Sequence, residues 1–281
     1  MAKIGVLGPG GVGGVLAARL GTAGHEVTVV ATDRTAAEIT ARGLVLRAPD
    51  GESVTRPSAR PWLAEPVDVL FVAVKATDLL PALQRVPAAV LGGATLVPLL
   101  NGVDHPKLLR ALYPAARVVA ASIAVEAVRH RPGVVEQLSG MADIGVADPE
   151  VARLLRAAGL TVAEHPDEVT VLWRKLTFLA PLALATTSAN APIGEVRESG
   201  ALRALVDETA AAAATRSVVV DADAVEARLH AMPDTMQSSM LRDFRSGRPL
   251  ELDAIAGPVL RALGVDKATA TAAAVRAILD A

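Results

Sequence analysis

Hydrophobic and polar residues follow two different patterns along the chain, and the change comes near residue 166. Before it, short apolar runs alternate with helical spacing. The runs that predict strands lie at 4–8, 26–31, 67–75, 94–102, 117–128, 133–139 and 142–148. The spacing predicts helices at 12–24, 36–43, 79–90 and 107–114. Several of these strands are too apolar to have a solvated face, which is typical of a parallel sheet covered on both sides.

Beyond residue 166 strand patterns nearly disappear and alanine-rich helical patterns follow one another. The predicted helices lie at 168–189, 201–219, 222–231, 236–246, 251–263 and 267–280. Pro166 and Asp167 suit a junction, because Asp can cap the helix that follows. We therefore expect an α/β protein with two domains. Residues 1–166 would form a Rossmann-type domain with a doubly wound parallel sheet, and residues 167–281 an all-helical domain.

Composition narrows the function classes. With 52% hydrophobic and 21% charged residues, the chain has enough apolar residues to fold around a core. A net charge of −2 without a basic block gives no sign of a nucleic-acid partner. Cysteine is absent and the five histidines show no metal-ligand spacing, so we expect no disulfide and no metal. No signal-peptide pattern and no apolar run near the ~20 residues of a membrane span are seen, so we expect a cytoplasmic protein.

A glycine-rich loop follows the first predicted strand and opens the first predicted helix. Gly8, Gly10 and Gly13 form the pattern G-x-G-x-x-G. The first glycine permits a tight turn, the second lets the backbone approach a pyrophosphate, and the third lets helix and strand pack closely. A glycine-rich turn without a ligand is the alternative, but the position between strand and helix favours a dinucleotide. The expected contacts are Gly8, Pro9, Gly10, Gly11, Val12 and Gly13.

The end of the second predicted strand bears on which nicotinamide cofactor is used. An acidic residue there would bind a ribose 2′-hydroxyl, whereas a cation would pair with a 2′-phosphate. Asp33 and Arg34 offer both, directly after Thr32. We favour NADPH, held by Thr32 and Arg34, because a guanidinium suits phosphate well. In the alternative NADH is used, and Asp33 could also serve only to cap the next helix.

Five separated segments resemble the ketopantoate reductases (2-dehydropantoate 2-reductases), in the family's order and over nearly the whole chain. They are "KIGVLGPGGVGG", "DVLFVAVKATDL", "LLNGVDH", "LWRKL" and "SSMLRDFRSGRPLELDAIAG". The last is the most specific, because Ser239 and Glu251 keep the family's spacing of twelve residues.

The resemblance implies an NADP-dependent oxidoreductase acting on CH–OH donors, which reduces 2-dehydropantoate to pantoate in pantothenate biosynthesis. The substrate would lie between the two domains. Lys175 matches the family's catalytic lysine, which donates a proton to the carbonyl oxygen, and Glu251 would support it. Ser239 would bind the substrate carboxylate. Asn101 and Lys75, at strand ends, would contact both cofactor and substrate. The alternatives without a catalytic role are that Lys175 is a surface lysine on a helix and that Glu251 is a carboxylate that stabilises a helix N-terminus.

The chain departs from the family on the helix that carries Lys175. The family usually has asparagines four and eight residues later, where this chain has Leu179 and Ala183. Thr186 and Asn190 lie further along the same face and could replace one contact. Two alternatives therefore stay open: a related reductase of another 2-oxo acid or an imine, and a non-catalytic nucleotide-binding sensor. The C-terminal helices would also allow a homodimer.

Overall fold

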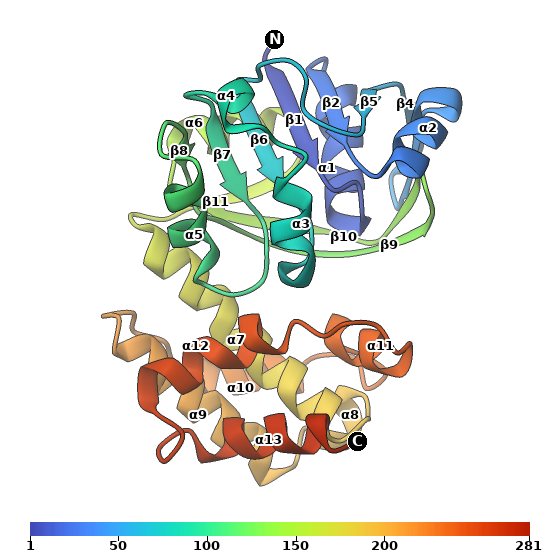
Figure 1. Cartoon of the computed structure of the whole chain (residues 1–281). Helices are drawn as coiled ribbons and strands as arrows, with labels where there is room; N and C mark the ends of the chain where they lie inside the picture. The colour runs from blue at the N-terminus through green and yellow to red at the C-terminus, as the bar shows by residue number, and fades with distance from the viewer. The chain divides into compact units, whose positions relative to one another are not determined.

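The computed structural model describes the backbone of residues 1–281 and all side chains except those of Met141 and Ala142. The chain forms two compact units. The first contains residues 1–100 and 105–171, and the second contains residues 101–104 and 172–281. The predicted boundary lies just ahead of helix α7 (Glu168–Ser188), and the units divide within this helix. Strands make up much of the first unit, and helices the second (Figure 1).

A six-stranded parallel sheet forms the centre of the first unit. Its order is β5-β2-β1-β6-β7-β8. The strands are β1 (Lys3–Leu7), β2 (Glu26–Val30), β5 (Ser58–Arg60), β6 (Val69–Val72), β7 (Thr95–Pro98) and β8 (Arg117–Val118). Apolar clusters cover both faces of the sheet, which explains why its central strands lack a polar face. The predicted Rossmann-type sheet is confirmed.

The connecting helices follow the predicted pattern with one exception. They are α1 (Gly11–Thr22), α2 (Asp33–Arg42), the 3₁₀ turn η1 (Ala76–Asp78), α3 (Leu79–Leu83), α4 (Ala88–Leu91) and α5 (His105–Leu112). The prediction of a single helix over 79–90 is wrong, because the chain forms α3 and α4 there with a break between them. Pro87 precedes α4, and a proline disfavours helical backbone at the residue before it.

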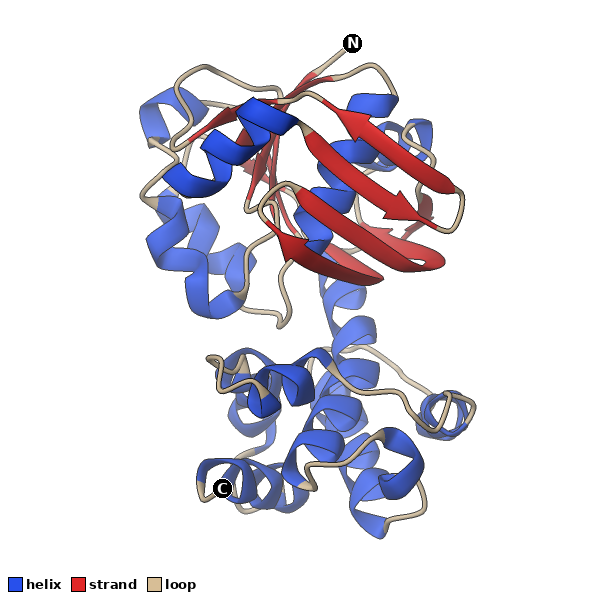
Figure 2. Cartoon of the chain, turned by 90° about the vertical axis from the view of Figure 1, so that its right-hand side faces the viewer, coloured by secondary structure: helices blue, strands red, loops and turns tan.

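A second sheet completes the first unit. Strands were predicted at 117–128, 133–139 and 142–148, but not that they form a sheet of their own, and the segment 117–128 is divided between β8 of the first sheet and a strand of the second. It contains β3 (Leu44–Ala48), β4 (Gly51–Thr55), β9 (Ala121–Arg131), β10 (Val134–Val146) and β11 (Thr161–Glu164). Strands β9 and β10 pair in antiparallel fashion, as do β3 and β4 (Figure 2). The segments 133–139 and 142–148 thus belong to one long strand and not to two. Helix α6 (Pro149–Ala157) lies between β10 and β11 in the chain.

Helix α1 packs between the two sheets. It contacts β1 and β2 of the first sheet and β3, β9 and β10 of the second. Most of its residues after Val12 are therefore buried, whichever way they point. The approach is close: a Cβ atom at Gly14 would lie 2.4 Å from the Cγ2 atom of Val135. Glycine at this position lets the second sheet reach the helix that begins at the glycine loop.

Helices are the only regular elements among the described residues of the second unit, and turns and loops connect them. Besides most of α7 it contains α8 (Ile193–Val196), α9 (Gly200–Ala214), α10 (Ala222–His230), α11 (Ser239–Arg245), α12 (Leu252–Leu263) and α13 (Thr269–Leu279). The six predicted helices are confirmed, and only the four-residue α8 was missed. Asp167 accepts hydrogen bonds from the backbone N–H and the hydroxyl of Thr170, both at 2.7 Å. It therefore caps α7 as predicted.

Helix α7 is long and apolar enough, by length and composition, to cross a membrane. However, 67% of its most apolar window is buried inside the fold, as expected of a core helix. Among the side chains that the structure describes, no group of three or more histidines and carboxylates is arranged to hold a metal ion.

Glu208, on α9, caps the N-terminus of the last helix, α13, although it belongs to a different helix. Its carboxylate accepts hydrogen bonds from the backbone N–H groups of Ala270 (2.7 Å) and Thr271 (2.8 Å), where α13 offers no side-chain cap of its own. We expect Glu208→Ala to lower the free energy of unfolding by about 1–3 kcal/mol, because two partly buried N–H donors lose their acceptor. Glu208→Gln should lose less. Asp266→Asn, at an exposed carboxylate before α13, is the control. Equal stability of Glu208→Ala and wild type in urea unfolding would contradict this role.

Candidate active site

The glycine loop is closely packed against the end of strand β6. Gly8 has a φ of +87°, a conformation that side chains rarely adopt, and a Cβ atom there would lie 2.4 Å from Val74. A Cβ atom at Gly13 would lie 2.1 Å from the carbonyl oxygen of Gly8 and 3.0 Å from Ala73. Strand, loop and helix can therefore meet this closely only with glycine at both positions.

Gly10 differs from its neighbours because a Cβ atom there would meet nothing within 4 Å. It lies at the N-cap of α1 and provides no side chain to the first N–H groups of the helix. These groups carry the positive end of the helix dipole. Open space above uncapped N–H groups is what a pyrophosphate requires, so the loop fits the diphosphate of a dinucleotide.

Three further residues of the loop have structural roles that the sequence did not reveal. Pro9 is buried, and Val12 packs against the apolar cluster between the two sheets. A Cβ atom at Gly11 would lie 2.7 Å from the carbonyl oxygen of Ala127 on β9. Close packing against the second sheet thus requires glycine at position 11, and this holds whether or not its backbone N–H binds a ligand.

The residues predicted to choose the cofactor follow β2 directly. Thr32 is the N-cap of α2, and Asp33 and Arg34 are the first two residues of this helix. All three are exposed. The hydroxyl of Thr32 donates to the hydroxyl of Thr35 at 3.1 Å. The N-cap of α2 is thus Thr32, which makes no side-chain capping hydrogen bond, and Asp33 lies in the first turn of the helix.

Lys75 lies on the segment that touches the glycine loop. It follows Val74, which limits the space at Gly8, and it precedes the turn η1. Strands β1 and β6 are parallel neighbours with Leu7 opposite Val72, so both chains leave the sheet at the same edge. Lys75 and the loop 8–13 thus lie at the same edge of the sheet, where the strands end.

Asn101 follows β7, yet it belongs to the second unit together with Gly102, Val103 and Asp104. Gly102 has a φ of +90°, and a Cβ atom there would lie 2.7 Å from the carbonyl oxygen of Ala254 on α12. The Asp104 carboxylate pairs with Arg261 of the same helix at 2.5 Å. Segment 101–104 is therefore fixed to α12 at both ends of the helix, at Ala254 in its first turn and at Arg261 in its last, and the N-cap of this helix is Glu251.

This attachment brings Asn101 to Glu251, although 150 residues separate them in the sequence. The Nδ2 atom of Asn101 donates to Oε2 of Glu251 at 2.9 Å. Glu251 is buried, with 7% of its surface exposed, and its side chain makes no capping hydrogen bond to α12. Its carboxylate is therefore directed at other groups and does not serve as a helix cap.

Lys175 lies on α7 within electrostatic range of this carboxylate. Burial lowers the pKa of its ammonium group to about 8, and the negative charge of Glu251 acts in the opposite direction. A lysine with this pKa holds and releases a proton near neutral pH, as an acid or a base must. Lys175, Glu251 and Asn101 together form what we term the lysine cluster.

Ser239 is exposed at the first position of α11, in the same unit as the lysine cluster. Its neighbour Ser238, by contrast, is buried and forms hydrogen bonds inside the helical unit. The Ser238 hydroxyl pairs with that of Thr186 at 2.8 Å and accepts from the backbone N–H of Leu241 at 3.0 Å. Ser238 thus fixes the start of α11 and leaves the hydroxyl of Ser239 on the surface.

The expectation that Thr186 or Asn190 replaces a missing asparagine is not supported, because the structure gives both other partners. Thr186 is fully buried and donates to the carbonyl oxygen of Leu182 at 2.7 Å. Asn190 lies beyond the end of α7, where its side chain accepts from Arg245 at 2.8 Å. At the two altered positions, Ala183 is buried in the helical core and Leu179 packs against that core.

Comparison with known proteins decides the family. The family described as "Ketopantoate reductase PanE/ApbA" matches residues 4–150, and its C-terminal counterpart matches residues 167–280. A 2-dehydropantoate 2-reductase of Mycobacterium tuberculosis (strain H37Rv) is 33% identical over 268 residues, which cover 92% of this chain and 90% of that protein. The chain belongs to the ketopantoate reductase family. It is thus a nucleotide-dependent oxidoreductase of the class that acts on CH–OH donors, and its family acts on small molecules.

Solved structures agree with the fold. A PanE/ApbA family ketopantoate reductase from Ralstonia eutropha JMP134 is similar with a TM-score of 0.88 at 26% identity, over 99% of this chain and 98% of that one. A D-mandelate dehydrogenase, solved with NADH and anilino(oxo)acetate, also has a TM-score of 0.88, over 99% and 97%. At 19% identity the second likeness concerns the fold alone.

The role of segment Gly102–Asp104 in the candidate site was not predicted from the sequence. The signal was present, because a glycine directly after a polar strand-end residue often marks a left-handed turn. What no local pattern could reveal is that this turn packs on α12.

Proposed function

We propose that the protein reduces a 2-oxo acid with NADPH, and that its substrate is 2-dehydropantoate, which it converts to pantoate. The observation that carries the proposal is the lysine cluster, in which a lysine with a pKa near 8 lies by a carboxylate held by Asn101. A nucleotide-binding sensor has no need of such an acid, so the cluster favours catalysis.

For the cofactor, the glycine loop would hold the pyrophosphate, and Thr32 and Arg34 would hold the 2′-phosphate. Lys75 and Asn101 are proposed to contact the nicotinamide half. When bound, NADPH supplies the hydride that reduces the carbonyl carbon.

The chain's own residues supply the rest of the chemistry. As negative charge develops on the carbonyl oxygen, the Lys175 ammonium stabilises it and transfers a proton from Nζ, which yields the hydroxyl of the 2-hydroxy acid. Glu251 stabilises the charged form of Lys175 and would accept a hydrogen bond from a substrate hydroxyl. Asn101 holds Glu251 in position. Ser239 would bind the substrate carboxylate.

A second candidate is a related reductase that acts on a different 2-oxo acid or on an imine. Leu179 favours it, because this partly exposed residue is apolar where the family usually offers an amide, and Ala183, at the second such position, offers no amide either and is buried in the helical core. A site that pairs a substrate hydroxyl discriminates by ~10⁴ or more, whereas an apolar site discriminates weakly. An apolar 2-oxo acid would then be turned over as well as 2-dehydropantoate.

A substrate panel tests the proposal and separates the two candidates. NADPH oxidation is followed at a fixed protein concentration with 2-dehydropantoate, with its analogue lacking the hydroxyl group, and with an aryl 2-oxo acid. Preference for 2-dehydropantoate by a factor of ~10 or more supports the first candidate. Equal or faster reduction of the apolar acids supports the second. Nucleotide binding without oxidation on any of them would contradict both.

The pH dependence of reduction follows from the proton on Lys175. Because the lysine must be protonated to act as an acid, kcat/KM for reduction should fall as pH rises through about 8. Glu251 raises this pKa, so its replacement in Glu251→Gln should move the descending limb to lower pH. The oxidation of the 2-hydroxy acid should rise over the same interval. A reduction profile flat to pH 10 would contradict the assignment of Lys175.

We further propose that the reaction takes place in the cytoplasm, with a small molecule as the partner and with neither a nucleic acid nor a membrane involved. The net charge of −2 without a basic block supports the absence of a nucleic-acid partner and of binding to an anionic membrane. The helical unit would also allow a homodimer, and light scattering measures the molar mass in solution that decides this.

A further inference from the structure

We propose that Arg85 is the second cation of the 2′-phosphate site and a determinant of the preference for NADPH. Its guanidinium would bind the phosphate together with Arg34 and offset the charge of Asp33. The inference rests on the proposed nucleotide dependence and adds a specificity residue that the sequence pattern did not predict.

Arg85 is held at the end of β2 by main-chain groups. It follows α3, and its Nη1 atom donates to the carbonyl oxygens of Ala31, at 3.3 Å, and of Pro61, at 2.8 Å. Its own carbonyl oxygen accepts from the backbone N–H of Leu63 at 2.8 Å. These contacts fix the guanidinium beside the residue that precedes Thr32. In a dinucleotide-binding fold the adenosine ribose lies at this strand end.

The guanidinium keeps donors for a ligand. The hydrogen bonds described for its side chain all come from Nη1, and a third of the side chain is exposed. Asp33 is its ionic partner, at 3.9 Å from Nη1, and that carboxylate is 86% exposed. Such a long, solvated contact is weak, so a phosphate can compete with it.

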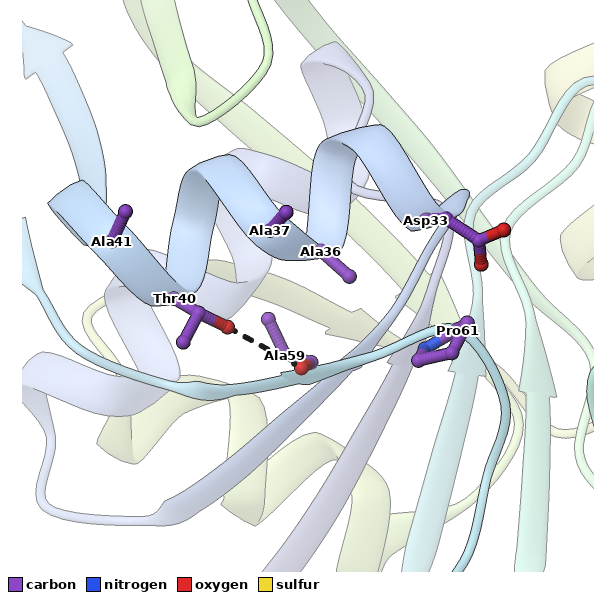
Figure 3. A pocket seen from close by; sticks show the side chains of 7 residues that line it. All are labelled: Asp33, Ala36, Ala37, Thr40, Ala41, Ala59 and Pro61. Atoms are coloured by element: carbon purple, nitrogen blue, oxygen red, sulfur yellow. Dashed lines mark hydrogen bonds between the residues drawn. The ribbon is translucent and has the colours of Figure 1, made fainter.

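Charge balance gives Arg85 its proposed role. Asp33 alone would repel a 2′-phosphate and would suit the 2′-hydroxyl of NADH. With Arg34 next to Asp33 in the chain and Arg85 3.9 Å from its carboxylate, the strand end carries two guanidinium groups against one carboxylate. Guanidinium groups bind phosphate oxygens in a forked geometry, which favours NADPH. Figure 3 shows Asp33 at the N-terminal end of α2, with Pro61, whose carbonyl Arg85 binds, near the same end.

Arg85 could instead serve only to join the segments that carry Ala31 and Pro61. Two substitutions separate these roles. Arg85→Gln removes the charge but can still donate a hydrogen bond to one of the two carbonyls, and Arg85→Lys keeps the charge. A structural role would affect NADPH and NADH alike, whereas a phosphate contact affects NADPH alone.

The experiment measures the dissociation constants of NADPH and NADH by nucleotide fluorescence in the whole protein. For Arg85→Gln we expect NADPH to bind about 10-fold or more weakly and NADH to change by less than about 2-fold. Arg85→Lys should keep most of the preference. Adding Asp33→Asn to Arg85→Gln should restore part of the NADPH affinity, because the remaining repulsion is removed. Arg47→Gln, at an exposed arginine paired with Glu52 on the second sheet, is the control and should change neither constant.

An equal loss for both nucleotides, or no loss for either, would overturn the role of Arg85. If the wild-type protein bound neither nucleotide, the proposed function would fail along with it. If instead the predicted ratios appeared but no 2-oxo acid were reduced, only the proposed reaction would fail. Thermal unfolding of each variant shows whether the fold is intact.

Discussion

Replacement of Lys175 by alanine should lower kcat for reduction by about 10²–10⁴-fold, because the reaction loses both its proton donor and the charge that stabilises the oxyanion. The substitution leaves the glycine loop intact. NADPH should therefore bind with nearly the same dissociation constant as in the wild type. Stopped-flow or steady-state measurement of NADPH oxidation checks the first expectation, and a fluorescence titration checks the second.

The neighbouring Arg174 provides a matched control for this experiment. It is an exposed cation on the same helix. Arg174→Ala removes one positive charge from α7 but no proposed proton donor, so kcat should stay within about 2-fold of the wild type. Equal rates for Lys175→Ala and wild type would exclude Lys175 as the acid. Equal losses in both variants would assign the effect to the net charge of the helix.

The glycine loop gives the second large effect. In Gly13→Ala the new Cβ atom would lie 2.1 Å from the carbonyl oxygen of Gly8, so the backbone of the loop must move. Overpacking of this kind costs about 1–3 kcal/mol. We expect Gly13→Ala to lower the stability of the protein and to weaken NADPH binding by at least about 10-fold, since the N–H groups that would bind the pyrophosphate shift.

Gly10→Ala separates ligand binding from packing. Its Cβ atom meets no protein atom within 4 Å, so the melting temperature should stay close to that of the wild type. The same atom would occupy the space proposed for the pyrophosphate, so NADPH should bind far more weakly. Gly200→Ala, where a Cβ atom also meets nothing, is the control outside the loop. Unchanged NADPH binding by Gly10→Ala would exclude the loop as the pyrophosphate site.

The first sheet could be predicted from the sequence because parallel strands buried on both faces consist of continuous apolar runs. The same rule did not reveal the second sheet. Strand β4 at its edge and the neighbouring β3 are short and partly exposed, so they lack long apolar runs. A signal for the second sheet was α1, whose residues are small and apolar on nearly every side because two sheets enclose the helix. A helix covered on one face only would show a polar face.

For the site, local motifs predicted single residues but not their partners. The spacing in the last motif pointed to Glu251, yet its hydrogen bond with Asn101 depends on how segment 101–104 packs on α12. For Thr186, in contrast, a site residue was expected where the structure has a core residue. Helix geometry put it on the same face as Lys175, whereas burial and the bond to Ser238 assign it to the core. The spacing of residues shows which side chains share one face of a helix, but the neighbouring helices decide whether that face is buried at a given residue.

Isotope transfer tests the central claim most directly. The protein is incubated with NADPH that carries deuterium at the transferable C4 position, together with 2-dehydropantoate or the acid that the substrate panel favours. We predict a 2-hydroxy acid with one deuterium at C2, formed at the wild-type rate by Arg174→Ala and at most about one hundredth of it by Lys175→Ala. A product without deuterium at C2, or the same labelled product at an equal rate from Lys175→Ala, would contradict the account.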